Sequence, residues 1–282
     1  MNFMDQTYQP VRTYAEFTNH YSALQKLRTV LRDAVVTGRS IARSIRRQPG
    51  NIAFPYYHHI FDDERRPFER QLDFLRGFGE FISLGDAVKM LTAGDTIDGQ
   101  YFCITFDDGF KNVLTNALPI MTDKGAPLAI FVPTQFIGTS LDTDLDLLQT
   151  FFDHGQTVIE FLTWDDLRTM GAAGVTIGSH TVHHARLADI AQAAAEREMV
   201  ESKKKIETEL SAPCDHFSSP FGQPYSDFNP GVHPVLAHKT GYRSFSSTER
   251  GVNIESDPYA VLKRDHTVAK WSTAQLQYFL GA

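Results

Sequence analysis

Short runs of apolar, β-branched and aromatic residues alternate with segments of helical periodicity along most of this chain, and this alternation limits the folds it can adopt. The runs expected to form strands cover residues 52–57, 101–106, 128–132, 175–178, 216–219, 242–245 and 260–262. Helical spacing of apolar side chains is seen between them, in residues 65–76, 84–91, 165–170 and 190–210. Because alternating strands and helices build a parallel sheet with the helices outside, we expect an α/β protein whose sheet is either closed into a barrel or open.

The segment before the first strand, residues 22–47, has the periodicity of an amphipathic helix with a basic face. Leu24, Leu27 and Leu31 recur at i, i+3 and i+7 along its apolar face. The other face carries one lysine and six arginines: Lys26, Arg28, Arg32, Arg39, Arg43, Arg46 and Arg47. Because Pro49-Gly50 would end this helix, we divide the chain into an N-terminal basic helical extension, residues 1–50, and a larger domain, residues 51–282.

The charge of the chain is unevenly distributed between these two parts. The 282 residues include 27 Lys+Arg and 34 Asp+Glu, a net charge of −7, but residues 1–50 alone carry +5 and the remainder −12. An acidic domain repels phosphates, which argues against nucleic acid as its ligand. The basic helix is expected either to pack on the larger domain or to make peripheral contact with an anionic membrane through residues 22–47.

Two further features concern the cellular context. Cys103 and Cys214 are the only cysteines, too few for a disulfide framework and without the spacing of a zinc or redox motif. The N-terminus lacks the charged and apolar regions of a secretory signal, and no apolar run approaches the length of a transmembrane helix. We therefore expect a cytoplasmic location, with membrane association left open.

Adjacent carboxylates follow one of the expected strands. Asp107 and Asp108 come directly after residues 101–106 and before Gly109, which suits a sharp turn with positive φ. Two neighbouring carboxylates repel each other when both are buried and ionised, so this pair needs a cation, a shared proton or open water.

Three histidines follow another expected strand, in the sequence His180-Thr181-Val182-His183-His184. On a helical turn, His180 and His184 would share one face with their Cβ atoms about 5–6 Å apart, while His183 would point away. The segment lacks the glutamate of HExxH, which excludes a zincin site. Since active sites in α/β proteins form where parallel strands end, one carboxylate and two imidazoles here suggest a catalytic metal.

Both clusters resemble motifs of one known family. Residues 105–109 read TFDDG and residues 180–187 read HTVHHARL, which are similar, in this order, to the first two motifs of the polysaccharide deacetylases (carbohydrate esterase family four, with a NodB-like domain). Residues 57–60, which read YHHI, and the approach to the second motif in residues 161–179 resemble the family as well. The resemblance spans roughly residues 52–265 and omits the N-terminal helix.

The resemblance implies a fold, an activity and a metal site. The fold would be a distorted (β/α) barrel of seven or eight strands, and the activity would be metal-dependent removal of acetyl groups from N-acetylated amino sugars. Carried over to this chain, Asp108, His180 and His184 would hold a divalent metal, zinc in most members. Asp107 would be the general base that takes a proton from the attacking water.

A third family motif, R-x-P-[YF]-G, corresponds to Ser218-Ser219-Pro220-Phe221-Gly222 in this chain. By the resemblance, the backbone N–H of Phe221 would stabilise the oxyanion. The arginine that orients the catalytic aspartate in the family is replaced here by Ser218. Asp107 is therefore expected to be held by another group or to be less well placed.

The general acid and the sugar-binding residues have weaker signals. The nearest match to the family's late L-x-H motif is Leu262-Lys263-Arg264-Asp265-His266, which makes His266 the expected general acid, with Asp265 or another carboxylate raising its pKa. His58 is the competing candidate. Tyr225 and Trp164 are candidates for lining the sugar site.

The sequence therefore predicts an N-deacetylase acting on an acetylated amino sugar, in a polysaccharide or in a glycan precursor such as a nucleotide-linked or lipid-linked sugar. One alternative is a hydrolase of a non-sugar amide on the same fold. The other is a catalytically silent module that binds a glycan or a membrane. The missing arginine and the unclear general acid are the observations that suggest this alternative.

Overall fold

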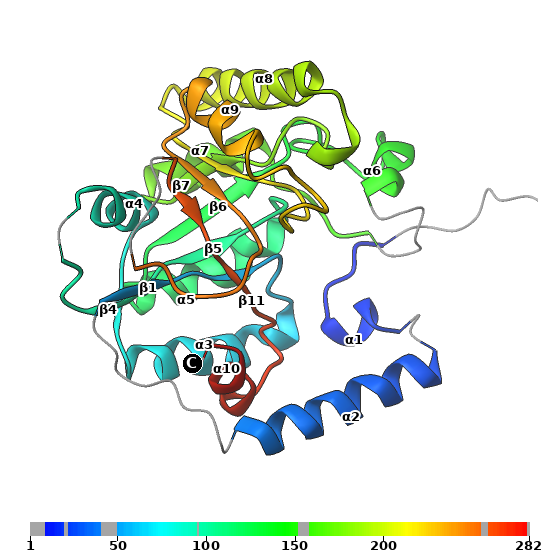
Figure 1. The fold of residues 1–282 in the computed structure, drawn as a ribbon. Helices are drawn as coiled ribbons and strands as arrows, with labels where there is room; N and C mark the ends of the chain where they lie inside the picture. Colours follow the sequence, from blue (N-terminus) through cyan, green and yellow to red (C-terminus); the bar gives the residue numbers. More distant parts are fainter. Residues whose placement is uncertain are drawn as a thin grey trace, which may run out of the picture.

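The computed structural model describes residues 9–19, 22–40, 50–94, 96–151, 158–254 and 259–280. Its centre is a sheet of eight parallel strands in the order β10-β9-β8-β7-β6-β5-β2-β11 (Figure 1). Their bounds are Pro55–Tyr57 (β2), Ile104–Phe106 (β5), Leu128–Val132 (β6), Thr176–Ser179 (β7), His216–Ser218 (β8), Ser244–Ser246 (β9), Val261–Leu262 (β10) and Asp265–His266 (β11). A smaller parallel sheet has the order β1-β4-β3, with bounds Asn51–Ala53, Gln100–Phe102 and Glu80–Phe81.

The large sheet is curled into a barrel, as its connectivity requires. Strands β10 and β11 lie at opposite edges of the sheet, yet only Lys263 and Arg264 separate them along the chain. In a flat sheet the two edges would be about 34 Å apart, whereas three peptide steps reach at most about 11 Å. The two edges must therefore meet, which confirms the distorted (β/α) barrel expected from the sequence.

Helices cover the outside of the barrel. Figure 1 shows α7, α8 and α9 on one side of the sheet and α3 and α10 on the opposite side. The helical bounds are Tyr14–Phe17 (α1), Ala23–Ser40 (α2), Arg65–Arg76 (α3), Leu84–Thr92 (α4), Leu118–Asp123 (α5), Leu145–Phe151 (α6), Trp164–Ala172 (α7), Gln192–Leu210 (α8), His233–Lys239 (α9) and Thr273–Leu280 (α10). Short 3-10 turns occupy Asp62–Glu64 and Leu187–Asp189, and a π-helical turn occupies Val113–Ala117. Thr163 and Asp166 form a capping box at the start of α7.

The expected strands are present, with two differences in how they are built. The runs 52–57 and 101–106 each divide, at Phe54 and Cys103, into one strand of the small sheet and one of the barrel. Both dividing residues are buried, so the chain crosses between the sheets through the core. Strand β11 was not predicted, because the pair Asp265-His266 lacks the apolar character by which strands are recognised.

Three clusters of buried apolar side chains support this arrangement. The largest joins the barrel to α3, α7, α8 and α9, and the second joins α4 and the small sheet to residues of β6 and β10. The third is rich in phenylalanine and includes Phe61, Phe110, Phe136 and Phe161. Val11, Tyr14 and Phe17 pack against this third cluster, so part of the N-terminal extension is fixed to the barrel.

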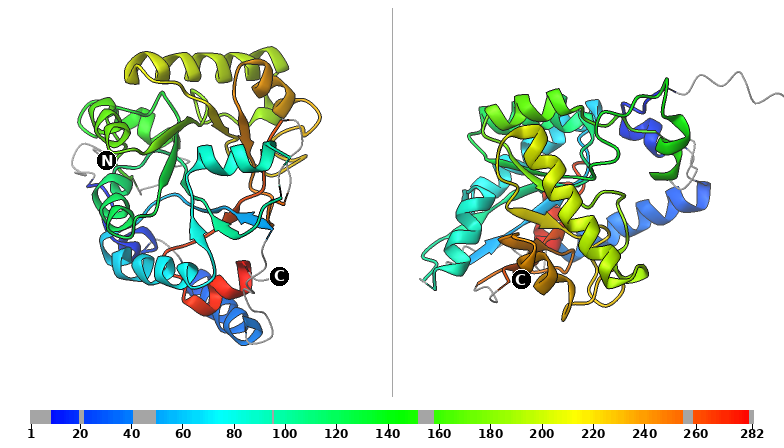
Figure 2. Two further views of the ribbon diagram at one scale, coloured as in Figure 1. Left: turned by 90° about the vertical axis from the view of Figure 1, so that its left-hand side faces the viewer. Right: turned by 90° about the horizontal axis from the view of Figure 1, so that it is seen from above.

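The N-terminal extension contacts the barrel through both of its helices. The backbone N–H of Val11 donates to Val158 O at 2.9 Å, and that of Tyr14 donates to Asp63 Oδ1 at 2.8 Å. Helix α2 packs on α10 at the margin of the molecule (Figure 2) and buries Val36 and Ser40. The predicted helix is confirmed to residue 40, whereas residues 41–47 lie outside the described part of the chain. None of the described helices combines the length and apolar character needed to cross a bilayer.

Candidate active site

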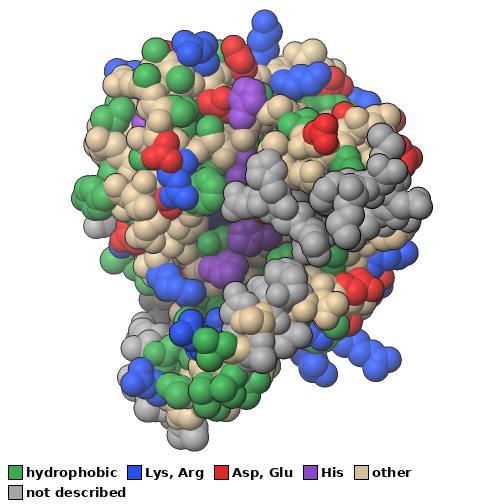
Figure 3. Space-filling view, turned by 90° about the vertical axis from the view of Figure 1, so that its right-hand side faces the viewer, with side chains coloured by type: hydrophobic (Ala, Val, Ile, Leu, Met, Phe, Trp, Pro, Cys, Tyr) green, Lys and Arg blue, Asp and Glu red, His purple; other side chains and the backbone are tan. Residues whose placement is uncertain are grey.

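A cavity of about 440 Å³ lies at the carboxyl ends of β2, β5 and β11 and opens onto Asp108. Its wall combines imidazole rings with large aromatic side chains, and two segments of the N-terminal extension complete it. The lining residues are Tyr14, Phe17, Arg32, His58, His59, Asp108, Phe110, Phe151, Ile159, His266, Val268 and Trp271. In the space-filling view of this side, histidines lie in a hollow of the surface (Figure 3).

Asp108, His180 and His184 come together at one point, as expected from the sequence. The Nε2 atoms of His180 and His184 lie 3.5 and 3.4 Å from Asp108 Oδ1, and the three groups offer ligand atoms within 4.8 Å of one another. Ligands bound at about 2.0–2.1 Å to a tetrahedral cation are about 3.4 Å apart, which is close to these distances. The donor set therefore fits a divalent cation such as zinc.

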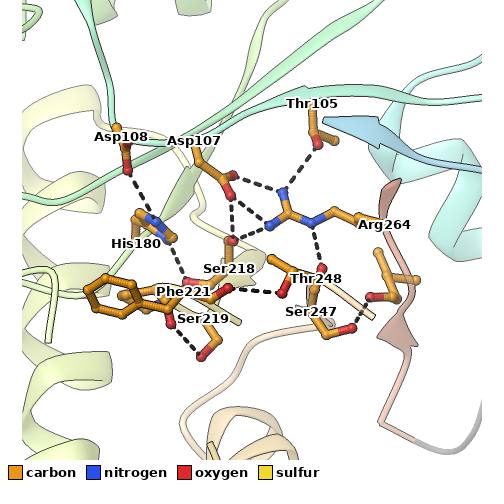
Figure 4. A network of polar contacts seen from close by, with 12 residues as sticks. Thr105, Asp107, Asp108, His180, Ser218, Ser219, Phe221, Ser247, Thr248 and Arg264 are labelled. Atoms are coloured by element: carbon orange, nitrogen blue, oxygen red, sulfur yellow. Dashed lines mark hydrogen bonds and ion pairs between the residues drawn. The ribbon is translucent and has the colours of Figure 1, made fainter. Parts of the chain in front are cut away.

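The protonation states of these three groups suit metal binding. Burial alone would raise the pKa of Asp108, but His58 and the two imidazoles hold it well below its usual range, so the carboxylate is ionised. Burial lowers the pKa of His184, which keeps this imidazole neutral. His180 Nδ1 lies 2.8 Å from the carbonyl oxygen of Ser218 and donates to it, which leaves Nε2 with a lone pair that faces Asp108 (Figure 4).

The two histidines meet through a loop and not on a helical turn, so that part of the prediction was wrong. Residues 180–186 form an irregular segment in which Thr181 and His184 have φ of 69° and 55°. This left-handed backbone curls the loop and brings the two rings to a centroid distance of 5.0 Å. As expected, His183 points away, and its Nδ1 lies 2.6 Å from Glu198 Oε1. Glu198 also accepts the backbone N–H groups of Val182 and His183, which fixes the loop.

Asp107 is held by Arg264, a residue that was not singled out as functional in the sequence. Nη1 and Nη2 of Arg264 donate to Asp107 Oδ1 and Oδ2 at 2.8 and 2.7 Å. Its remaining donors reach Ser218 Oγ at 2.8 Å, Thr105 Oγ1 at 3.2 Å and the Ser247 carbonyl at 3.0 Å (Figure 4). All five N–H groups of this fully buried guanidinium are thereby satisfied.

This contact determines the charge of Asp107. Burial by itself would raise the pKa of Asp107, but the charge and hydrogen bonds of Arg264 outweigh it and lower the pKa below its ordinary value. Asp107 is therefore a carboxylate at neutral pH despite being buried, as a general base must be. The motif that carries an arginine in the family has Ser218 at that position here. In this chain Arg264, in the connection between β10 and β11, pairs with Asp107 instead.

The loop after β8 brings a free backbone donor toward the histidines. Phe221 has φ of 60°, and its ring packs against His184 at a centroid distance of 5.0 Å and under the guanidinium of Arg186 at 4.1 Å. Thr248 Oγ1 donates to the Phe221 carbonyl at 2.9 Å and fixes the turn. Within the described residues the Phe221 N–H donates no hydrogen bond, so it is available for an oxyanion.

His266 and His58 both line the cavity, with ring centroids 5.3 Å apart. Burial, together with the charges of His58 and Arg250, lowers the pKa of His266 to about 3. The expectation that Asp265 raises this pKa was wrong, because Asp265 turns toward Arg250, 3.4 Å away. His266 is therefore a neutral imidazole at pH 7.

The structure does not bring the two proposed sugar-binding aromatics to this cavity. Tyr225 is 88% exposed and lines a separate surface pocket with Pro224 and Phe228, while Trp164 packs at the start of α7. The cavity is lined instead by Phe110, Phe151 and Trp271, which were not predicted to be functional.

Comparison with known proteins agrees with this geometry. A sequence profile of the family described as polysaccharide deacetylase matches residues 95–244, more than half of the chain. This chain belongs to the polysaccharide deacetylase family. It is 25% identical over 210 residues to YxkH of Bacillus subtilis (strain 168), a candidate polysaccharide deacetylase, and the match covers 72% of this chain and 67% of YxkH.

Solved structures of polysaccharide deacetylases share the fold. IcaB from Ammonifex degensii superposes with a TM-score of 0.67 at 19% identity, and the Streptococcus pyogenes deacetylase PplD in complex with acetate superposes at 0.64 and 20% identity. Each match covers 83% of this chain and 99% of the other. The matched length leaves room for an extension, such as residues 1–50, outside the common barrel.

The first prediction concerns Arg264. We expect Arg264→Gln to destabilise the protein by about 3–5 kcal/mol, because it leaves Asp107 buried without its counter-charge. The pKa of Asp107 should rise, since burial is then uncompensated. In the wild type this carboxylate stabilises the fold above pH ~4 and loses that contribution as the pH falls. In the variant the sign reverses, and stability should fall as the pH rises above ~4.

Urea unfolding of both proteins between pH 3.5 and 7.5 tests this prediction. Lys263→Gln is the matched control, because it removes the neighbouring cation, whose partner Glu249 lies at the surface, and should change stability by less than about 1 kcal/mol. Equal pH dependence in Arg264→Gln and the wild type would show that Arg264 does not control Asp107.

Proposed function

We propose that this polysaccharide deacetylase is a metal-dependent hydrolase that removes the acetyl group from an N-acetylated amino sugar. The observation that carries the proposal is the placement of two buried carboxylates with different partners. Asp108 faces two imidazoles at 3.4–3.5 Å, while Asp107 is locked to Arg264. One carboxylate is thus arranged as a ligand and the other as a base.

In the proposed mechanism Asp108, His180 and His184 hold the divalent cation, most simply Zn²⁺. When bound, this cation would supply a Lewis acid that polarises the amide carbonyl and lowers the pKa of water. Asp107 accepts the proton of the attacking water, and Arg264 keeps one face of the carboxylate oriented throughout. The backbone N–H of Phe221 donates to the oxyanion that forms from the carbonyl oxygen.

Release of the amine needs a proton, and we assign its delivery to the two imidazoles on the cavity wall. His266 is the donor predicted from the sequence. Because burial makes it neutral in the free protein, it has to gain a proton during the cycle, and Asp107 is the nearby carboxylate whose charge favours this. His58, on the same wall, is the alternative donor.

The metal site gives the second prediction. His184→Ala should lower the affinity for Zn²⁺ by more than about 100-fold, because it removes one of three ligands. His183→Ala is the matched control, since this neighbouring histidine points toward Glu198 and should leave the affinity within about threefold of the wild type. Calorimetric titration of the metal-free proteins measures both. Full affinity in His184→Ala would overturn the ligand set.

The third prediction concerns the base. Asp107→Asn should lower kcat for acetate release from N-acetylglucosamine oligomers by about 10²–10⁴-fold, because the amide cannot accept a proton. Zn²⁺ affinity should be retained, since Asp107 is not among the proposed ligands. Acetate release at the wild-type rate would contradict the assignment, as would the failure of the zinc-loaded wild type to release acetate from any acetylated amino sugar.

The fourth prediction separates the two imidazoles. His266→Gln should lower kcat by about 10²–10⁴-fold and remove the alkaline limb of the pH profile of kcat, because that profile reports the enzyme–substrate complex, in which His266 acts as the donor. His58→Gln should have a smaller effect on kcat and retain that limb. The opposite pattern would assign proton donation to His58.

A further inference from the structure

Helix α2 exposes its apolar face to solvent instead of burying it. Leu24, Leu27, Leu31 and Val35 follow one another at helical spacing, and Val30 lies beside them. Each of these five side chains is 53–64% exposed. A continuous apolar stripe of this size is unusual on the surface of a protein that works alone in water, and it indicates an interaction surface.

The side chains of α2 form three parallel stripes. Val36 and Ser40, one turn apart, are buried where the helix packs on α10. Arg28, Arg32 and Arg39 lie one or four residues after a leucine or valine of the apolar stripe. At helical spacing they form an exposed basic stripe along one edge of the apolar stripe. The helix is therefore anchored by one face and presents apolar and basic side chains together on the others.

The charge of this surface favours anionic lipid over a second copy of the chain. The only acidic residue on α2 is Asp33, and Arg32 already pairs with it at 3.0 Å. Pairing two α2 helices would bring two basic stripes together without acidic partners. An anionic bilayer offers phosphates to the arginines and an acyl boundary to the leucines and valines, which is how interfacial helices bind.

We propose that α2 is an interfacial helix that docks this protein on anionic membranes. The same face carries the opening of the active-site cavity, since Arg32 belongs both to the basic stripe and to the cavity wall. In Figure 3 an apolar patch with Lys and Arg at its margin lies below the histidine-lined hollow, at the level of α2 in Figure 1. Docking would therefore place the cavity mouth beside the lipid headgroups, where a sugar carried at the membrane surface is presented.

Vesicle flotation of the full chain tests this proposal without any measurement of catalysis. We expect binding to phosphatidylcholine vesicles made anionic with phosphatidylglycerol, weaker binding to phosphatidylcholine alone, and weaker binding to the anionic vesicles when salt is added. Leu27→Glu combined with Leu31→Glu should lower the partition coefficient at least about tenfold, because two apolar anchors are lost and two negative charges are gained.

Two further variants keep the test specific. Arg28→Gln combined with Arg39→Gln leaves the apolar stripe intact. This variant should bind the anionic vesicles more weakly than the wild type and should lose most of the salt dependence of binding. Val200→Glu is the control, since it places a charge at an exposed apolar position on α8 and should bind like the wild type. Equal binding by wild type and the Leu27/Leu31 variant would overturn the proposal. The proposal would also be overturned if the wild type bound no vesicles and was a dimer in light scattering while the Leu27/Leu31 variant was a monomer.

Discussion

The pairing of Arg264 with Asp107 is the interaction on which the rest of this active site depends. Arg264 lies in the two-residue connection that joins the opposite edges of the eight-stranded sheet, and its side chain fills the interior of the barrel. There it contacts groups on or next to β5, β8 and β9 and packs on the rings of Tyr56 and Phe131. A buried ion pair of this kind is costly to desolvate, so complete hydrogen bonding is the condition for its presence. The connection that closes the barrel therefore also supplies the cation that keeps Asp107 ionised.

The chemistry of the site also depends on strained backbone in the loops that leave the strands. Asp108, Thr181, His184 and Phe221 all have positive φ, which costs a non-glycine residue of the order of 1–3 kcal/mol. Gly109 has φ of 73° next to Asp108, and a Cβ there would lie 3.0 Å from Ile137, so a sharp turn at this point requires glycine. In these loops one carboxylate meets two imidazoles, and the ring of Phe221 packs on His184. The hydrogen bonds of Glu198 and Thr248 maintain the loops that carry them.

Much of this arrangement could be predicted from the sequence because it is local. Buried strands and the motifs around Asp107 and His180 are recorded in neighbouring residues, and the structure has the strands where they were expected and brings Asp108 to His180. Arg264 is not local, since it meets Asp107 across 157 positions of the chain and directly precedes β11, a strand too polar to recognise. Because Ser218 replaces the family arginine, we expected another group to hold Asp107, but the sequence does not indicate which residue this is. Likewise, the spacing of His180 and His184 was consistent with a helix, but the left-handed backbone of Thr181 and of His184 itself forms a loop instead.

The N-terminal extension has a closer relation to the site than its place outside the family resemblance suggested. Tyr14, Phe17 and Arg32 complete the wall of the cavity that ends at Asp108, so the cavity would be wider and more open without them. The inner end of this cavity combines a carboxylate with imidazoles, whereas its outer wall carries the guanidinium of Arg32. Arg32 thus brings one basic residue of the N-terminal extension to the wall of the cavity that contains Asp108. In the proposed function, a substrate has to pass Arg32 and the aromatic wall formed by Tyr14 and Phe17 before it reaches Asp108, so the extension helps to decide which substrates enter.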